Sequence, residues 1–347
     1  MVFDMRSLPV PVVGAPMAGG ATTPALVAAV SDAGGMGFLA AGYLTAEKLA
    51  DQIRETRRLT SRPIGVNLFV IAENEVDAQQ LDDYAARIAD DAHALGITLG
   101  EPRWDDDHYE DKIETLLSTD VDLVSFTFGV PEESVVQRFK AAGIAVAVNV
   151  TSVEETHAAQ RVSADVLIVQ GAEAGGHRGA FLAEGPGMPP PLPALVRAIR
   201  AVSSLPIVAG GGIASAWQAQ AVLEAGASAV QIGTALLLSD EAGTSQTVRD
   251  ALLSGEFTET TVTRAFTGRP ARALENDFTR HHSDAAPSAF PQLHFMTTPL
   301  RAAASQAHDA QRLHLWAGTG FAECRRGPAA EIVRSMVNPH EGSHTPA

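Results

Sequence analysis

The sequence predicts an α/β fold, a (β/α)8 TIM barrel, and three observations lead to this prediction. Eight short apolar runs rich in β-branched residues alternate with longer alanine-rich segments that carry charges at helical spacing. Most of these runs begin about twenty to thirty residues after the previous one, as expected for one strand and one helix per unit. With 347 residues, 46% of them hydrophobic, the chain can bury a core of the required size.

The eight apolar runs are the predicted strands. Because helices should cover the outside of a parallel barrel, its strands are expected to be apolar on both faces. The predicted strands are Val10 to Ala15, Met36 to Ala40, Pro63 to Leu68, Val121 to Phe126, Ile144 to Asn149, Asp165 to Val169, Pro206 to Gly210 and Ala229 to Gly233.

The predicted helices lie between these strands and carry recognisable start and stop signals. Thr45, Ser152 and Ser215 stand where an N-cap is expected, and Gly143 and Gly226 stand where helices should end. The helices are Pro24 to Asp32, Ala46 to Leu59, Glu132 to Ala142, Val153 to Gln160, Pro191 to Val202 and Ser215 to Glu224.

Two intervals between strands are longer than one helix requires. Residues 71–120, after the third strand, contain an amphipathic helix (EVDAQQLDDYAARIADDAHAL) and an Asp-rich segment (WDDDHYED), which we expect to be a solvated turn. Residues 170–190 form a loop rich in Gly and Pro. Since both follow the carboxyl end of a strand, where barrel active sites lie, we interpret them as a lid and an active-site loop.

The rest of the chain completes the expected domain organisation. Residues 240–347 have a less regular pattern and end in NPHEGSHTPA. We predict one barrel over residues 1–335, including the helical insertion at about 71–120, and a flexible tail over 336–347.

Composition excludes several classes of protein. The formal net charge of −16 disfavours nucleic acid and anionic membranes as partners. Cys324 is the only cysteine, so an internal disulfide is impossible, and no spacing of Cys, His or acidic residues predicts a metal site. The first twenty residues lack a basic region and a continuous apolar region, and no longer apolar run follows. We therefore expect a cytoplasmic protein without a metal.

An open dinucleotide-binding sheet is the alternative that the glycines suggest. AGGGIAS lies between a strand and a helix and approaches the GxGxxG pattern. The next strand, however, carries Gln231 where a carboxylate should bind the ribose. The same glycines fit a phosphate site better, because the loops after strands seven and eight of a barrel commonly bind phosphate. Gly211 and Gly212 lie in the first of these loops, and Gly233 and Thr234 lie in the second.

His177 is the candidate catalytic residue. It lies in the loop QGAEAGGHRG after the sixth strand, and an imidazole is the side chain best suited to moving a proton near neutral pH. Asn67 ends the third strand, where its amide could donate to or accept from a heteroaromatic ring. Pro16 and Met17 lie at the mouth of the barrel, where Met17 could equally be a core residue.

Six segments together resemble the nitronate monooxygenase family, formerly called 2-nitropropane dioxygenases. They are GAPMAGG, GGMGFLAAGYL, GVNLF, QGAEAGGHRG, VAGGGI and VQIGTALL, and FTGRPARALEN and LWAGTGF follow in the same order. The resemblance spans residues 9 to about 320 and implies an FMN-dependent TIM barrel. FMN-dependent enoyl-acyl carrier protein reductases share the same loops and the same His, so they remain an alternative.

The resemblance also implies roles for individual residues. His177 would be catalytic, and Ala317 and Gly318 would close over the flavin. In LWAGTGF, however, the TGF after WAG departs from a family pattern that often has Gln there. The residues implied to bind the cofactor are Ala15, Pro16, Met17, Asn67 and Gln170 at the flavin, Gly175 and Gly176 against it, and Gly211, Gly212, Gly233 and Thr234 at its phosphate.

The function that the resemblance implies is oxidation of alkyl nitronates by molecular oxygen to carbonyl compounds and nitrite, with nitroalkanes as a further candidate substrate class. His177 would act as a base or would hold the substrate anion. Two alternatives stay open: a flavin reductase that uses NAD(P)H, such as the enoyl reductase, and a barrel that binds a phosphorylated ligand without redox chemistry. The sequence leaves the oligomeric state open.

Overall fold

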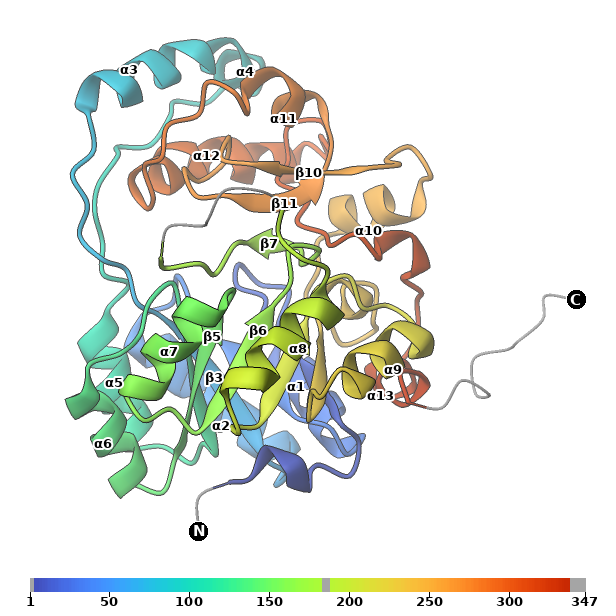
Figure 1. Ribbon diagram of the computed structural model, residues 1–347. Coiled ribbons are helices and arrows are strands. Elements are labelled where there is room, and N and C mark those ends of the chain that lie inside the picture. Colours follow the sequence, from blue (N-terminus) through green and yellow to red (C-terminus); the bar gives the residue numbers. More distant parts are fainter. Residues whose placement is uncertain (1–2, 183–187, 338–347) are drawn as a thin grey trace, which may run out of the picture.

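The structure is a barrel of eight parallel strands surrounded by helices, which confirms the predicted fold class (Figure 1). The computed structural model describes residues 3–182 and 188–337. Most of the expected tail, residues 338–347, therefore lies outside the described residues.

The barrel strands occur at all eight predicted places. Their order around the barrel is β1-β9-β8-β6-β5-β4-β3-β2, with every pairing parallel. The barrel closes between β1 and β2, because Gly14 N donates to Met36 O at 2.9 Å and Met36 N donates to Val12 O at 3.1 Å. The strands are β1 (Val12–Gly14), β2 (Gly37–Ala40), β3 (Ile64–Phe69), β4 (Leu123–Thr127), β5 (Ala145–Val150), β6 (Val166–Gln170), β8 (Ile207–Gly210) and β9 (Ala229–Ile232).

Eight helices cover the outside of the barrel. Side chains of Thr23, Thr45 and Ser152 cap the first, second and fifth of them by accepting a main-chain N–H, as the N-cap signals predicted for Thr45 and Ser152. The helix that completes the last unit comes from the end of the chain. The eight are α1 (Pro24–Asp32), α2 (Ala46–Leu59), α5 (Tyr109–Leu117), α6 (Glu133–Ala141), α7 (Val153–Arg161), α8 (Leu192–Val202), α9 (Ala216–Glu224) and α13 (Ala329–Ser335).

The barrel interior is apolar in its lower part. Alternate strand residues, such as Val13, Leu123 and Ala147, point inward and form one buried cluster. Met5, from the short helix η1 (Met5–Ser7), belongs to this cluster and is 1% exposed. The ring of Phe38 occupies the space beside Gly65, where a Cβ would lie 2.4 Å from the ring. The interior is therefore a packed core rather than a channel.

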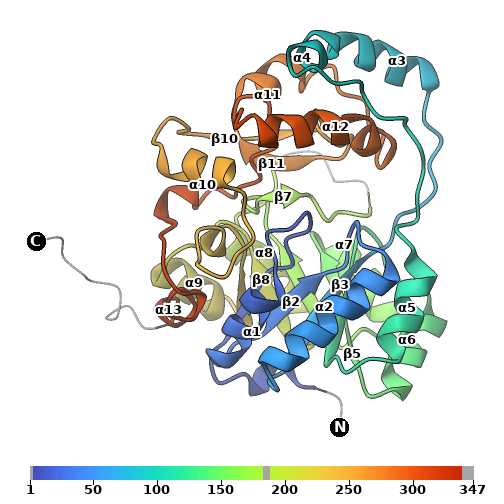
Figure 2. The ribbon, with the colours of Figure 1, turned by 180° about the vertical axis from the view of Figure 1, so that it is seen from behind.

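A second body, here called the cap, lies above the carboxyl ends of the strands (Figures 1 and 2). We define it as residues 78–94, from the predicted insertion, together with residues 260–316. Its three-stranded antiparallel sheet has the order β10-β11-β7. The cap elements are α3 (Ala78–Arg87), α4 (Ala89–Ala94), β10 (Thr260–Thr263), β11 (Ala271–Leu274), α11 (Asp277–His282) and α12 (Gln292–Gln306), and β7 (Gly176–His177) joins them from the loop after β6.

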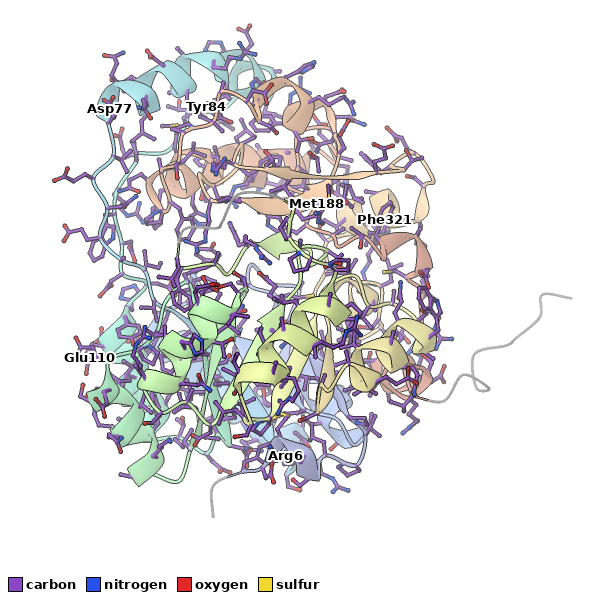
Figure 3. All side chains as sticks on the ribbon, viewed as in Figure 1. Arg6, Asp77, Tyr84, Glu110, Met188 and Phe321 are labelled. Carbon is purple, nitrogen blue, oxygen red and sulfur yellow. The ribbon has the colours of Figure 1, made fainter. Side chains whose placement is uncertain are left out.

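Both parts of the cap share one core. Asp77 caps α3, and Tyr84 of the same helix is buried and donates from its hydroxyl to Ala265 O at 2.7 Å (Figure 3). Asp91 of α4 accepts from Arg312 Nε at 2.7 Å and contacts Nε2 of His282 at 2.8 Å. The insertion is therefore held over the barrel by the C-terminal region, for which the sequence analysis assigned no elements.

The Asp-rich segment differs from its expected solvated state. Asp106 is exposed, but Asp107 is buried, and its carboxylate lies 2.7 Å from Nζ of Lys112, which is 1% exposed. Asp107 also accepts from the main-chain N–H of Tyr43 at 2.8 Å. The expectation failed for Asp107 because Lys112, on α5, supplies a buried cation that compensates the carboxylate.

The remaining elements connect the barrel to the cap. They are η2 (Thr234–Leu236), α10 (Gln246–Leu253) and η3 (Phe321–Glu323). Among the described residues, no helix has the length and apolarity needed to span a membrane.

Candidate active site

The predicted site residues gather at the carboxyl ends of the barrel strands, beneath the cap. Ala15 follows β1, Asn67 lies in β3, Gln170 ends β6, and the two glycine loops follow β8 and β9. Most strand residues below them are fully buried. Of the twelve predicted site residues, all except Asn67 are partly accessible. The residues therefore line an accessible space at the top of the barrel.

A layer of polar side chains forms the floor of this space. The inward-pointing positions are apolar lower in the barrel but become amides and hydroxyls at the ends of the strands. Because strand side chains alternate with period two, these residues point toward the same interior. The layer comprises Asn67, Ser125, Thr127, Asn149, Gln170 and Gln231. Asn149 and Gln231 were not predicted as site residues. The alternation of side chains along the predicted strands nevertheless indicates that both point into the barrel.

Asn67 is held in one orientation by its neighbours on β4. Its Oδ1 accepts from Ser125 Oγ at 2.9 Å and from Thr127 Oγ1 at 2.8 Å. Within the described residues, its Nδ2 donates to no protein atom. The amide therefore presents a donor, whereas the sequence alone allowed either a donor or an acceptor.

The glycine loops after β8 and β9 form a narrow cradle. Gly211 and Gly212 have φ values of 142° and 70°, which side chains rarely adopt. A Cβ on Gly212 would lie 2.7 Å from Oγ1 of Thr319. Oγ1 of Thr234 accepts from the N–H of Gly318 at 2.9 Å, so its own hydrogen is left to donate.

Residues 317 and 318 close against the cradle from the C-terminal side. A Cβ on Gly175 would lie 2.5 Å from both the carbonyl carbon of Ala317 and the nitrogen of Gly318. The N–H of Thr319 donates to Glu173 O at 3.0 Å. The loop after β6, the loop after β9 and the 317–320 segment thus meet at one place.

Gln170 fixes the main chain of the loop that carries His177. Its Nε2 donates to His177 O at 3.0 Å, and its Oε1 accepts from Gly179 N at 2.8 Å. His177 also lies in β7, where it pairs with Ala271 of the cap. The barrel and the cap therefore both position this residue.

The imidazole of His177 lies in an aromatic enclosure. Its ring centroid lies 5.4 Å from that of Trp316, 5.6 Å from that of Phe290 and 6.0 Å from that of Phe128. Its Nε2 lies 2.9 Å from Oγ1 of Thr267. Burial and, less strongly, the positive charges of Arg269 and Arg301 together lower the pKa of His177 to about 3. The imidazole is therefore neutral near pH 7.

Three residues near His177 were not predicted: Tyr43, Arg269 and Arg301. Both arginines lower the pKa of His177, and the same two charges act on the phenol of Tyr43. Tyr43 has a φ of 67° and stacks on His294, with 4.2 Å between ring centroids. A bulky residue at positive φ is unusual and often marks a functional site. A single sequence contains no signal for such a backbone conformation.

Comparison with known proteins assigns this architecture to a family. The model of the family described as "Nitronate monooxygenase" matches residues 5–339. The chain belongs to the nitronate monooxygenase family. It is 36% identical over 341 residues to a probable nitronate monooxygenase of Staphylococcus aureus strain MSSA476, with 96% of this chain and 95% of the relative covered. The relative from strain JH9 matches equally well, at 36% identity over the same length and coverage.

Solved structures give the same result. The crystal structure of nitroalkane oxidase from Streptomyces ansochromogenes is 44% identical, with a TM-score of 0.91 and 95% of both chains covered. FabK from Thermotoga maritima, at 24% identity and a TM-score of 0.75 over 96% of this chain and 93% of that one, shows a shared fold only. Membership of the nitronate monooxygenase family makes this chain a flavin-dependent oxidoreductase of nitro compounds.

Proposed function

We propose that this enzyme uses FMN to oxidise alkyl nitronates with molecular oxygen, giving carbonyl compounds and nitrite. The observation that carries the proposal is the position of a neutral His177 at the edge of a polar-floored, glycine-lined space. FMN, when bound, would supply the two-electron acceptor and the reactivity toward oxygen. The chain's own groups would bind, orient and deprotonate the substrate.

The polar floor and the cradle fit a flavin mononucleotide. Asn149 Oδ1 and Gln231 Nε2 are buried without a hydrogen-bond partner among the described residues, as expected of groups that face a polar ligand. The Nδ2 group of Asn67 likewise calls for a ligand that accepts a hydrogen bond. The phosphate would be held by Gly211, Gly212, Gly233 and Thr234. The absence of a side chain at Gly212 leaves space for it, since a Cβ there would lie 2.7 Å from Oγ1 of Thr319.

The other predicted residues would surround the flavin ring. Ala15, Pro16 and Met17 follow β1, and a Cβ on Gly233 would lie 3.3 Å from Cβ of Ala15 and 3.8 Å from the sulfur of Met17. Gly175 and Gly176 would approach the ring from the loop after β6. Gln170 already uses both ends of its amide to hold that loop, so its main role would be to position His177.

His177 would act as the general base for a neutral nitroalkane. A protonated imidazole could hold the substrate anion, but the lowered pKa of His177 favours the neutral form and therefore the base. Oγ1 of Thr267 also lies 3.4 Å from Arg269 O, which can accept its hydrogen. Nε2 would then donate to Thr267, and Nδ1 would carry the lone pair that removes the α-proton. A nitronate has already lost this proton.

The proposal is tested by identifying the cofactor and its reductant. Cofactor released by heat should be FMN and not FAD, because the cradle offers one phosphate site. Under anaerobic conditions, ethyl nitronate should bleach the flavin much faster than NADH does. Faster reduction by NADH, together with turnover of a crotonyl thioester, would instead assign an enoyl reductase.

A second experiment tests His177 itself. His177→Asn should reduce kcat/KM for neutral nitroethane by about 10²- to 10⁴-fold, because general-base assistance is lost. The value for ethyl nitronate should fall far less, with flavin content matched between variant and parent. Equal losses for both substrates would show that His177 does not act as the base.

A further inference from the structure

Among the described residues, no acidic side chain pairs with the buried cation Arg301. It lies on α12 and is 9% exposed. Its Nη2 donates to His294 O at 2.8 Å and to Thr298 Oγ1 at 2.9 Å, and its Nε donates to Thr297 Oγ1 at 3.2 Å. All these partners are neutral. Within the described residues, its Nη1 donates to no protein atom, so one edge of the guanidinium is left for another acceptor.

Arg269 has the same character, and both arginines act electrostatically on His177. Its Nε donates to Arg178 O at 3.0 Å, and its Nη2 donates to Ala180 O. Its guanidinium carbon lies 4.0 Å above the ring of Phe128, which itself contacts His177. Within the described residues, Nη1 of Arg269 also has no protein acceptor. Burial lowers the pKa of both Arg269 and Arg301 to about 10, which leaves both charged near pH 7.

The carboxylates of Glu155, which acts on Arg269, and of Asp107, which acts on Tyr43, are already committed elsewhere. Glu155 accepts from Thr151 N and Oγ1, from Phe181 N and from Leu182 N. Asp107 pairs with Lys112. No carboxylate oxygen of the described residues lies within 4.0 Å of either Arg269 or Arg301. Glu155 acts on Arg269 only at longer range. Two largely buried cations with no carboxylate in contact among the described residues are costly, and an anionic ligand would offset that cost.

An open cleft lies beside Arg269. Its volume is about 430 Å³, and Arg269 and Phe290 line it together with Asn74, Arg264 and Pro270. Phe290 also contacts His177. Arg269 and Phe290 therefore belong both to the lining of the cleft and to the surroundings of the base. The arginines that line the cleft attract anions locally, despite the negative charge of the whole chain.

We propose that Arg269 and Arg301, assisted by the phenol of Tyr43, form a specificity subsite that binds a planar oxyanion of the substrate beside His177. This proposal rests on the proposed function. A guanidinium presents paired donors that match two oxygens on one atom, a geometry shared by a nitronate and a carboxylate. The oxyanion is either the nitronate group itself or a carboxylate elsewhere on the substrate. In both cases the subsite selects ionised substrates over neutral ones.

Binding of acetate and acetamide to the oxidised holoenzyme tests the subsite without turnover. The two probes have the same shape and differ in charge, and flavin absorbance reports their binding. Acetate should bind more tightly than acetamide to the parent. Arg269→Gln and Arg301→Gln should each weaken acetate binding by about ten- to one-hundred-fold and leave acetamide binding nearly unchanged. Arg197→Gln, at an exposed arginine on α8, is the matched control and should change neither affinity.

Other results would overturn the subsite. A parent that binds both probes equally, or Gln variants that weaken both probes equally, would show that the arginines only support the structure. Where Arg301→Gln does not yield folded protein, Arg301→Lys keeps the charge and removes the paired donors. That variant should still lose affinity for acetate but not for acetamide, and an unchanged acetate affinity would overturn the role of Arg301.

Steady-state kinetics then identify the source of the oxyanion. With Arg269→Gln, a higher KM for both ethyl nitronate and the nitronate of 3-nitropropionate would assign the subsite to the nitro oxygens. A higher KM for the carboxylated substrate alone would assign it to the carboxylate, and no change for either would overturn the proposal. If the parent oxidises neither nitronate yet prefers acetate through its arginines, the proposed function fails while the subsite stands.

Discussion

Removing one member of the buried ion pair of Asp107 and Lys112 should destabilise the enzyme much more than neutralising both. At the observed 2.7 Å, an effective dielectric constant of 20 gives an attraction of about 6 kcal/mol between the two charges. Desolvation of both ions offsets much of this attraction. A single change, however, leaves an uncompensated charge behind, which typically costs about 3–5 kcal/mol.

The free energy of unfolding should therefore fall by about 3–5 kcal/mol in both Asp107→Asn and Lys112→Met. The double variant should lose clearly less than the sum of these two losses. Urea denaturation of the holoenzyme, followed by circular dichroism at a fixed FMN concentration, measures all four proteins. Glu110→Gln, at an exposed acid on the same helix, is the control.

The pH dependence of the single variant gives an independent check. Burial already raises the pKa of Asp107, and the charge of Lys112 opposes that rise. In Lys112→Met the folded pKa should rise further above the unfolded value. As pH rises from the unfolded pKa through the folded pKa of Asp107, the variant should then lose stability relative to the parent. The difference in free energy of unfolding between parent and variant should therefore be smaller at pH 5 than at pH 8. Losses below about 1 kcal/mol, or strict additivity in the double variant, would refute a compensating buried pair.

Three further predictions concern the site. Gly212→Ala should retain less FMN than Gly143→Ala. Both glycines have positive φ, but only at Gly212 would a Cβ lie 2.7 Å from a neighbouring atom. Equal FMN content in the two purified variants would contradict the cradle. Thr267→Val should lower kcat for nitroethane more than for ethyl nitronate, since it removes the partner of His177 Nε2, and stopped-flow flavin reduction measures both rates. Because the folded pKa of His177, about 3, lies below its ordinary value of 6.5, the parent should lose stability as pH falls from 6.5 toward 3, and His177→Asn should flatten this decline in urea midpoints.

The barrel could be predicted from the sequence because its signal is local. Each strand is a short apolar run next to a helix with its own capping residue, and all eight strands lie where these runs predicted them. The last barrel helix, α13, was not predicted, since about a hundred residues separate it from β9 and no local pattern indicates where it packs. The amphipathic helix of the insertion was predicted and corresponds to α3 and α4. The cap elements in residues 260–316 were missed for the same reason as α13, because they are stabilised by contacts with residues 78–94 that are distant in sequence.

The site could be predicted only in part. Glycine loops and His177 follow strand ends, so topology alone brings them together. The fixed amide orientation of Asn67 depends on hydroxyls from the neighbouring strand, and the placement of Tyr43 depends on Asp107 in the insertion. Arg269 and Arg301 look like ordinary surface residues in a sequence, since only the structure shows that no acid of the described residues contacts them.

The pairing of β7 with β11 gives the base and the cofactor cradle different mechanical supports. His177 shares a sheet with Ala271 of the cap, whereas Gly211 and Gly233 extend from strands of the barrel. The segment that joins β6 of the barrel to His177 includes Gly171, Gly175 and Gly176. Thr267, Phe290 and Trp316 of the cap contact the same imidazole, so a shift of the cap relative to the barrel would change the position of the base relative to the cradle. Alignment of the base with the cofactor cradle is in this way set by how the cap packs on the barrel.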